Sequence, residues 1–188
     1  KDGNEDLRRL VAADIDPNVR ANAARVLGAT EDKQSFDALV ARATGDLDLR
    51  VRVNAIRALA ALKDPRAADA LLKRGELLSQ RISIHGLPAE NNEVLEIATT
   101  LGRLVAQNED HKAVAWLRKL SEAFNHSAPE VELALVRIAP TAYVASFGTG
   151  DQARRKVQET ILLDWRAASG IGTGLGEIAA LPETMKNK

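Results

Sequence analysis

The chain repeats one stretch of its own sequence: residues 16–28 read DPNVRANAARVLG, and residues 48–60 read DLRVRVNAIRALA. An aspartate, a valine, two arginines, an asparagine, an alanine and a leucine return at the same places, 32 residues further along. A period of this size is typical of a solenoid, whose units bury their apolar faces by stacking on one another. The sequence therefore predicts a repeat protein.

Each unit is expected to contain two helices. Apolar residues recur at helical spacing in the first helix, so that they share one face. Asp32 and Asp64 indicate where the second helices begin, because an aspartate side chain accepts hydrogen bonds from the free amide groups at a helix start. Small residues on the first helices allow close helix packing, and they are Ala23, Ala24, Ala55, Ala58, Ala60 and Ala61.

The pattern Asp-Pro-x-Val-Arg followed by Ala-Ala-Arg-x-Leu-Gly resembles the HEAT repeat, in the short variety also called the PBS-lyase type. The resemblance covers residues 14–79. It implies an all-α fold, a right-handed α-α superhelix of the HEAT-like solenoid kind. In that family the first helix of each pair lies on the convex side, and the second lines a concave surface where partners usually dock.

Weaker versions of the pattern extend the repeats, so we expect a HEAT-like domain over residues 1–168 and a Gly-rich tail over 169–188. Residues 79–91 are read as an insertion, which either packs over a gap in the stack or shapes a binding groove. A half-unit at the start indicates one region of a longer protein, since bacterial HEAT arrays are often joined to a catalytic domain. The expected units are 1–14 (half), 15–46, 47–79, 92–125, 128–147 and a capping helix at 151–168 with Ala153, Val157, Ile161, Trp165 and Ala168 on one face.

Composition excludes several classes of function. The chain has 26 basic and 26 acidic residues, so it lacks the overall basic charge of non-specific nucleic-acid binders. It has no cysteine, which excludes disulfides, thiolate metal sites and cysteine nucleophiles and fits either cytoplasm or periplasm. No apolar run approaches the about 20 residues that a membrane span needs.

Sequence motifs predict no catalytic residue, no cofactor and no metal site. The three histidines, His85, His111 and His126, are not spaced as metal ligands, and the His-Glu pairs of the HEAT-like deoxyhypusine hydroxylases are missing. The glycines of Gly170–Gly176 do not fit the G-x-G-x-x-G pattern of a phosphate-binding loop. No Gly-x-Ser-x-Gly motif is present.

Three residues each allow two interpretations. Arg20 and Arg52 occupy equivalent positions, where they either pair with an acidic or carbonyl partner in the adjacent unit, so that a ladder forms along the turns, or form a row that binds phosphate or carboxylate groups. Trp116 aligns with Leu39 and Leu71, which favours core packing over an exposed recognition residue.

The function that the sequence favours is that of a non-catalytic scaffold, which binds a protein or peptide partner on its concave surface. Two alternatives remain from the resemblance. One is a bilin lyase or chaperone of the PBS-repeat kind, and the other is a HEAT-like nucleic-acid-binding protein.

The partner-binding residues are expected on the second helices, on the side opposite the core residues Leu71 and Leu72. Equivalent positions in three successive units form a row that mixes both signs of charge. Such a row suits a charged peptide better than a polyanion, because like charges repel. The predicted row consists of Asp37, Asp69, Lys73, Glu76 and Arg118.

Overall fold

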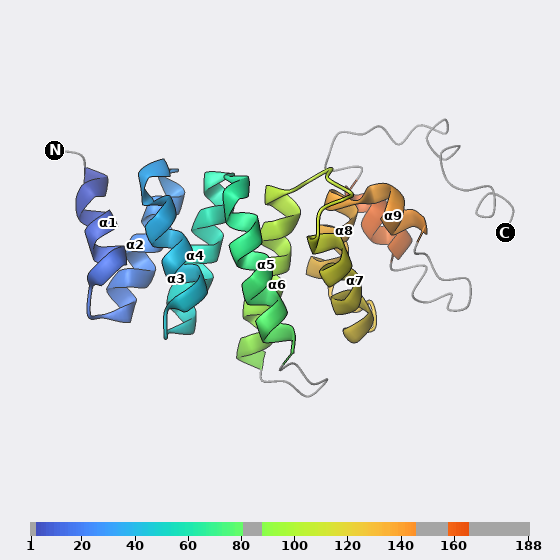
Figure 1. Ribbon diagram of the computed structural model, residues 1–188, viewed down its shortest axis with the longest axis horizontal. Coiled ribbons are helices and arrows are strands. Elements are labelled where there is room, and N and C mark those ends of the chain that lie inside the picture. Colours follow the sequence, from blue (N-terminus) through green and yellow to red (C-terminus); the bar gives the residue numbers. More distant parts are fainter. Residues whose placement is uncertain (1–2, 81–87, 146–157, 166–188) are drawn as a thin grey trace, which may run out of the picture. The chain divides into compact units, whose positions relative to one another are not determined.

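The computed structural model describes residues 3–80, 88–145 and 158–165, and every regular element in these ranges is helical (Figure 1). The all-α fold that the sequence predicts is therefore confirmed. The chain divides into two compact units, Lys1–Val105 and Ala106–Lys188. Among the described residues, no helix is long and apolar enough to cross a membrane.

The first unit is a stack of helices in two layers (Figure 1). In one layer α1 packs beside α3 and α3 beside α5, while in the other α2 packs beside α4 and α4 beside α6. A short 3₁₀ turn precedes α3 and another precedes α5. The helices are α1 (Gly3–Ala13), α2 (Pro17–Ala29), α3 (Phe36–Gly45), α4 (Leu49–Leu62), α5 (Ala68–Ser79) and α6 (Pro88–Leu104).

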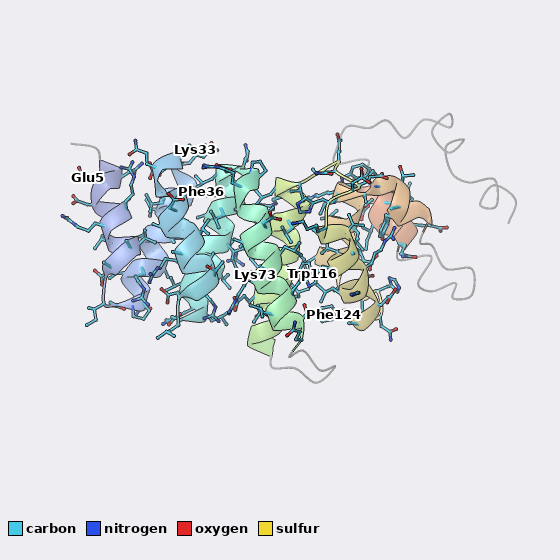
Figure 2. The ribbon with its side chains drawn as sticks, in the orientation of Figure 1. Glu5, Lys33, Phe36, Lys73, Trp116 and Phe124 are labelled. Atoms are coloured by element: carbon cyan, nitrogen blue, oxygen red, sulfur yellow. The ribbon has the colours of Figure 1, made fainter. Side chains whose placement is uncertain are left out.

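The second unit contains α7 (Ala113–Ala123), α8 (Pro129–Ile138), α9 (Pro140–Ala145) and a helical segment at 158–165. Helix α7 packs on α8, and α8 on α9. Trp116 of α7 is buried, which confirms the core interpretation of this residue. Figure 2 shows its place on α7.

Aspartate side chains accept a capping hydrogen bond at the starts of three helical elements, and for Asp64 this confirms the expectation. Asp16 accepts a hydrogen bond from the amide of Asn18 at 2.8 Å, and Asp48 and Asp64 accept equivalent bonds at the starts of α4 and of the 3₁₀ turn before α5. The same expectation is wrong for Asp32, whose side chain caps no helix. Both of its oxygens instead accept bonds of 2.6 Å from the guanidinium of Arg8, 24 residues earlier.

The small residues bring the two first helices of the repeats into close contact. A Cβ atom added to Gly28 of α2 would lie 2.7 Å from the Cα of Ala58 in α4, which is too close for any real side chain. The expected core residues Leu59 and Leu71 are completely buried. The repeat register read from the sequence is therefore the register of the core.

The later boundaries differ from the expected ones. Helix α6 begins at Pro88, inside the expected insertion 79–91, and residues 81–87 lie outside the described part. In the segment 158–165 the buried residues are Gln158 and Leu162, whereas Ile161 and Trp165 are only half-buried, so the core face of this helix is shifted from the expected one. Ala153, Val157, Ala168 and the tail 169–188 also lie outside the described residues.

Candidate functional site

Arginine and carboxylate groups form a ladder between the repeats of the first unit. Arg20 of α2 binds both oxygens of Asp46 at 2.9 Å and also donates to the backbone carbonyl of Asp14. Arg52 of α4 binds Glu93 at 2.9 Å and donates to the carbonyl of Asp46 in the same way. The ladder interpretation of Arg20 and Arg52 is confirmed, because these guanidinium groups are occupied inside the unit.

A second arginine forms an ion pair with each of these buried carboxylates. Arg42 lies 3.2 Å from Asp46, and Arg74 lies 2.9 Å from Glu93. Burial is the largest single influence and raises the pKa of Asp46, but the hydrogen bonds from Arg20, from the Asp48 amide and from Arg42 together with the charge of Arg20 outweigh it, so the pKa lies below its ordinary value. Each arginine of this ladder therefore has a buried carboxylate partner within the unit, and these pairs hold the helices of the repeats together.

The predicted partner-binding residues of the first unit, unlike the ladder residues, are exposed charged residues. Asp37, Asp69, Lys73 and Glu76 are all exposed, on α3 and α5, and Figure 2 shows Lys73 on α5. Asp69 already interacts with another group of the protein, so it is not counted among the charges available to a partner. The side chains of Asp37, Lys73 and Glu76 make no hydrogen bond or ion pair with another residue of the described part.

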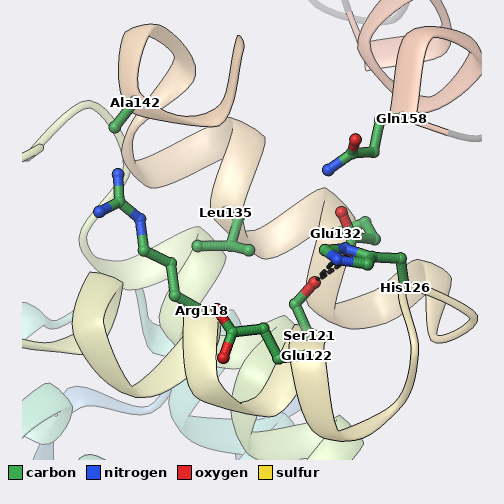
Figure 3. A pocket seen from close by; sticks show the side chains of 8 residues that line it. All are labelled: Arg118, Ser121, Glu122, His126, Glu132, Leu135, Ala142 and Gln158. Carbon is green, nitrogen blue, oxygen red and sulfur yellow. Dashed lines mark hydrogen bonds and ion pairs between the residues drawn. The ribbon is translucent and has the colours of Figure 1, made fainter. Parts of the chain in front are cut away.

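Arg118, the fifth predicted residue, belongs to the second unit and is exposed on α7. It makes no ion pair with any residue that the structure describes, and its side chain lines a cavity of that unit (Figure 3). The structure therefore brings four of the predicted residues to one helix layer and places the fifth at a different feature.

One further acidic residue extends the row and was missed. Glu5 of α1 precedes Asp37 by 32 residues, as Asp37 precedes Asp69, and all three are exposed in the first turn of their helices. The repeat period would have found it. Acidic residues in a first turn also interact favourably with the helix dipole, so this part of the row has a structural role as well.

An aromatic residue lies at the start of the same face. The guanidinium of Arg66 stacks over the ring of Phe36 at 4.3 Å, and it also binds Asp64 at 2.6 Å. Arg66, in the 3₁₀ turn before α5, is therefore engaged within the unit, unlike Lys73 seven residues later on α5.

The second unit holds a buried polar cluster that sequence analysis did not identify. Ser121 of α7 donates a hydrogen bond to Oε1 of Glu132, which lies on α8. Nδ1 of His126 lies 2.7 Å from the Ser121 hydroxyl and 3.2 Å from the same Glu132 oxygen (Figure 3). Asn125 and His126 both have a φ of 57°, and this left-handed turn returns the imidazole ring to the helices.

This serine, histidine and glutamate do not form a catalytic relay. In such a relay the serine binds one ring nitrogen of the histidine and the carboxylate binds the other. Here both groups approach Nδ1, and the serine proton points to the carboxylate. The cluster is therefore not arranged to activate the serine as a nucleophile.

The remaining histidines and glycines that were considered as functional residues are placed as follows. Nδ1 of His111 accepts a hydrogen bond of 3.1 Å from the amide of Ala113, at the start of α7. Within the described ranges, no group of three or more histidine or acidic residues could hold a metal ion. His85 and Gly170–Gly176 lie outside these ranges.

Comparison with known proteins finds a family similarity within the first unit. Residues 4–76 match the family model described as HEAT repeats. No curated protein matches the chain. The matched segment runs from α1 into α5 and contains Asp37, Asp69, Lys73 and Glu76.

Proposed function

We propose that the HEAT repeats of residues 4–76 act as a non-catalytic scaffold, which binds a charged segment of a partner protein along the face formed by α3 and α5. One observation carries this proposal: each arginine of the ladder already has a carboxylate partner inside the unit, whereas Asp37, Lys73 and Glu76 are exposed and have no ion-pair partner among the described residues. Exposed charges of this kind steer a partner and set its register more than they add affinity.

The position of these residues within the repeat supports the same face. Helices α3 and α5 are the second helices of their pairs, and the HEAT resemblance implies that second helices line the concave, partner-binding surface. The first helices carry Arg20 and Arg52 and the close Gly28 contact, while Arg42 of α3 and Arg74 of α5 are paired with the buried carboxylates. A segment with basic groups opposite Asp37 and Glu76 and an acidic group opposite Lys73 would complement this face.

The PBS-type resemblance allows two alternative ligands for this face, a nucleic acid and a bilin. A nucleic acid is disfavoured on this face because the acidic Asp37, Asp69 and Glu76 outnumber Lys73 among its predicted binding residues. A bilin carries carboxylate groups, which would meet the same acidic side chains unfavourably. A partner protein is the choice that the charge pattern favours.

The experiment uses the full chain and a partner captured from native lysate and then purified. Lys73→Glu should weaken binding to that partner by about tenfold, which is ~1.4 kcal/mol, while the helical circular-dichroism spectrum stays unchanged. Arg25→Glu is the matched control, because Arg25 is exposed on α2 in the other layer and makes no ion pair with a described residue. Unchanged affinity after Lys73→Glu, or equal losses from both variants, contradicts the proposed face.

A separate variant tests whether the site extends beyond the first unit. Arg118→Glu should also weaken binding of the partner if the row continues onto α7. If only Lys73→Glu has an effect, the binding face is restricted to the HEAT repeats of the first unit.

A further inference from the structure

Glu132 differs from every other buried carboxylate that the structure describes. It is completely buried, and the described residues that contact it are Ser121, His126 and Tyr143, with no arginine or lysine among them. Burying a carboxylate is costly unless a cation or several hydrogen bonds compensate it. The carboxylates of the first unit have such cations, in the pairs Asp32 with Arg8, Asp46 with Arg20 and Arg42, and Glu93 with Arg52 and Arg74.

Among the described residues around Glu132, only the imidazole of His126, 3.2 Å from Oε1, can carry a positive charge. Burial, followed by the charge of Glu132, raises the pKa of the Tyr143 phenol well above its ordinary value, so the phenol stays neutral. Oε1 of Glu132 carries the contacts to Ser121 and His126, and the Tyr143 phenol also interacts with the carboxylate, while Oε2 has no hydrogen-bond partner of good geometry among the described residues. The carboxylate therefore has capacity for another donor.

A cavity of about 460 Å³ lies beside this carboxylate, within the second unit (Figure 3). Pockets that bind small ligands span roughly 300–1,000 Å³, so a ligand of several heavy atoms fits here. Leu135 of α8 forms an apolar part of its wall, Glu132 lies at one end, and Figure 3 shows Arg118 on the other side of Leu135.

Gln158 points into the cavity without a partner. Its side chain is 2% exposed, and Figure 3 shows its amide facing the side of the cavity that holds Glu132 and His126. It makes no hydrogen bond to any residue in the described ranges. Buried amides are nearly always hydrogen-bonded, so this one is suited to a ligand group in the cavity.

We infer that this cavity binds a ligand that ends in a primary ammonium group, either a free alkylamine or the side chain of a lysine. An ammonium group offers three donors and one positive charge, and Glu132 with the carbonyl oxygen of Gln158 supplies a compensating charge and acceptors. Glu122, which also lines the cavity, adds a second negative charge. Arg118 lies where a carbonyl or carboxylate further along the same ligand would reach it. The site is separate from the α3 and α5 face and does not depend on it.

The test is a titration of the full chain, followed by calorimetry and by NMR of the glutamine side-chain amides. n-Butylammonium chloride should bind saturably and shift the Gln158 amide signals, whereas n-butanol, of the same length without the charge, should not. L-lysine and an acetylated peptide with a single lysine distinguish the two sources: binding of the free amino acid indicates a small-molecule site, and binding of the peptide alone indicates a partner's side chain.

Variants assign the binding to the named residues. Glu132→Gln keeps the shape of the side chain and should weaken n-butylammonium binding by about tenfold or more, because a buried ion-pair partner is lost. Glu130→Gln, at an exposed position on α8, is the matched control and should leave the affinity unchanged. Gln158→Met keeps the length of the side chain but removes its strong acceptor, so it should weaken binding as well.

Several results overturn the inference. These are no saturable binding of n-butylammonium, equal binding of n-butanol, or wild-type affinity in Glu132→Gln. If Glu132→Gln does not fold, Gln158→Met decides, because wild-type affinity in that variant excludes the assigned site.

Discussion

Arg52 of α4 binds Glu93 of α6 at 2.9 Å, and this pair does in the second repeat what Arg20 and Asp46 do in the first. Arg52 follows Arg20 by 32 residues, but Glu93 follows Asp46 by 47. The residue 32 positions after Asp46 is the buried Leu78, which cannot accept a hydrogen bond. The carboxylate therefore comes from the next helix, and the ladder continues beyond the inserted residues.

Replacing Glu93 should cost much of the stability of the first unit. Glu93→Gln leaves the guanidinium groups of Arg52 and Arg74 without their counter-ion in a buried place, and breaking a buried pair costs about 3–5 kcal/mol. Urea denaturation measures the change in the free energy of unfolding. Glu96→Gln is the control on the same helix, because its partner Arg57 is 62% exposed and such surface pairs contribute about 0–1 kcal/mol. Similar losses from both variants would show that burial of the ladder contributes nothing.

Gly28 should not accept a side chain. Gly28→Ala places a methyl group 2.7 Å from the Cα of Ala58, so α2 and α4 have to move apart, at a cost of about 1–3 kcal/mol. Gly45→Ala is the matched control at the end of α3, where an added Cβ meets nothing within 4 Å. Thermal and urea unfolding compare the two variants. The close contact between α2 and α4 is contradicted if both variants are as stable as the wild type.

Two leucines of α5 test the repeat register. Leu71 is completely buried, so Leu71→Ala should lower the free energy of unfolding by about 2–5 kcal/mol through lost apolar contact and the cavity left behind. Leu77 is 50% exposed on the same helix, and Leu77→Ala should cost clearly less. A change within about 0.5 kcal/mol for Leu71→Ala, as is usual for surface sites, would mean that the register is wrong.

Acid should unfold the first unit by protonating its paired aspartates. The pKa values of Asp32, Asp46 and Asp48 are lowered in the folded state, that of Asp48 to about 2. An unfolded aspartate has a pKa of about 3.9. Because the folded values are the lower ones, their contribution is complete above the unfolded pKa and is lost as the pH falls through the folded values.

Urea denaturation at a series of pH values measures this dependence. The free energy of unfolding should decrease as the pH falls from about 4 to about 2. Asp46→Asn removes one of the titrating groups and should make the decrease smaller, apart from its effect at neutral pH. A free energy of unfolding that stays constant over this range would contradict the lowered pKa values.

Local patterns explain why so much of the first unit could be predicted. Asp16 and Asp48 cap their helices because the acceptor and the amide it binds lie two residues apart in the chain. Asp32 has the same local pattern, yet its partner Arg8 is 24 residues away, and a bidentate ion pair is stronger than a cap. Sequence patterns predict the local cap, but they do not predict the ion pair between residues that are distant in the chain.

Of the two candidate sites, one could be predicted from local sequence patterns and the other could not. The exposure of Asp37 and Lys73 follows from helical periodicity, because core residues on one side of a helix leave the other side to solvent. The cluster of Ser121, His126 and Glu132 has no repeat pattern or known motif. It depends on a left-handed turn at Asn125 and His126, which no neighbouring residue in the sequence indicates.

The sequence by itself determined the helical repeat, its 32-residue period, the core leucines and the outward charges of α3 and α5, because each depends on spacing along a single helix. Only the tertiary structure decided which carboxylate each arginine binds, that α6 supplies Glu93, and that a buried Glu132 faces Gln158 across a cavity. These contacts join residues distant in the chain, and their strength comes from burial, which exists only once the helices have packed.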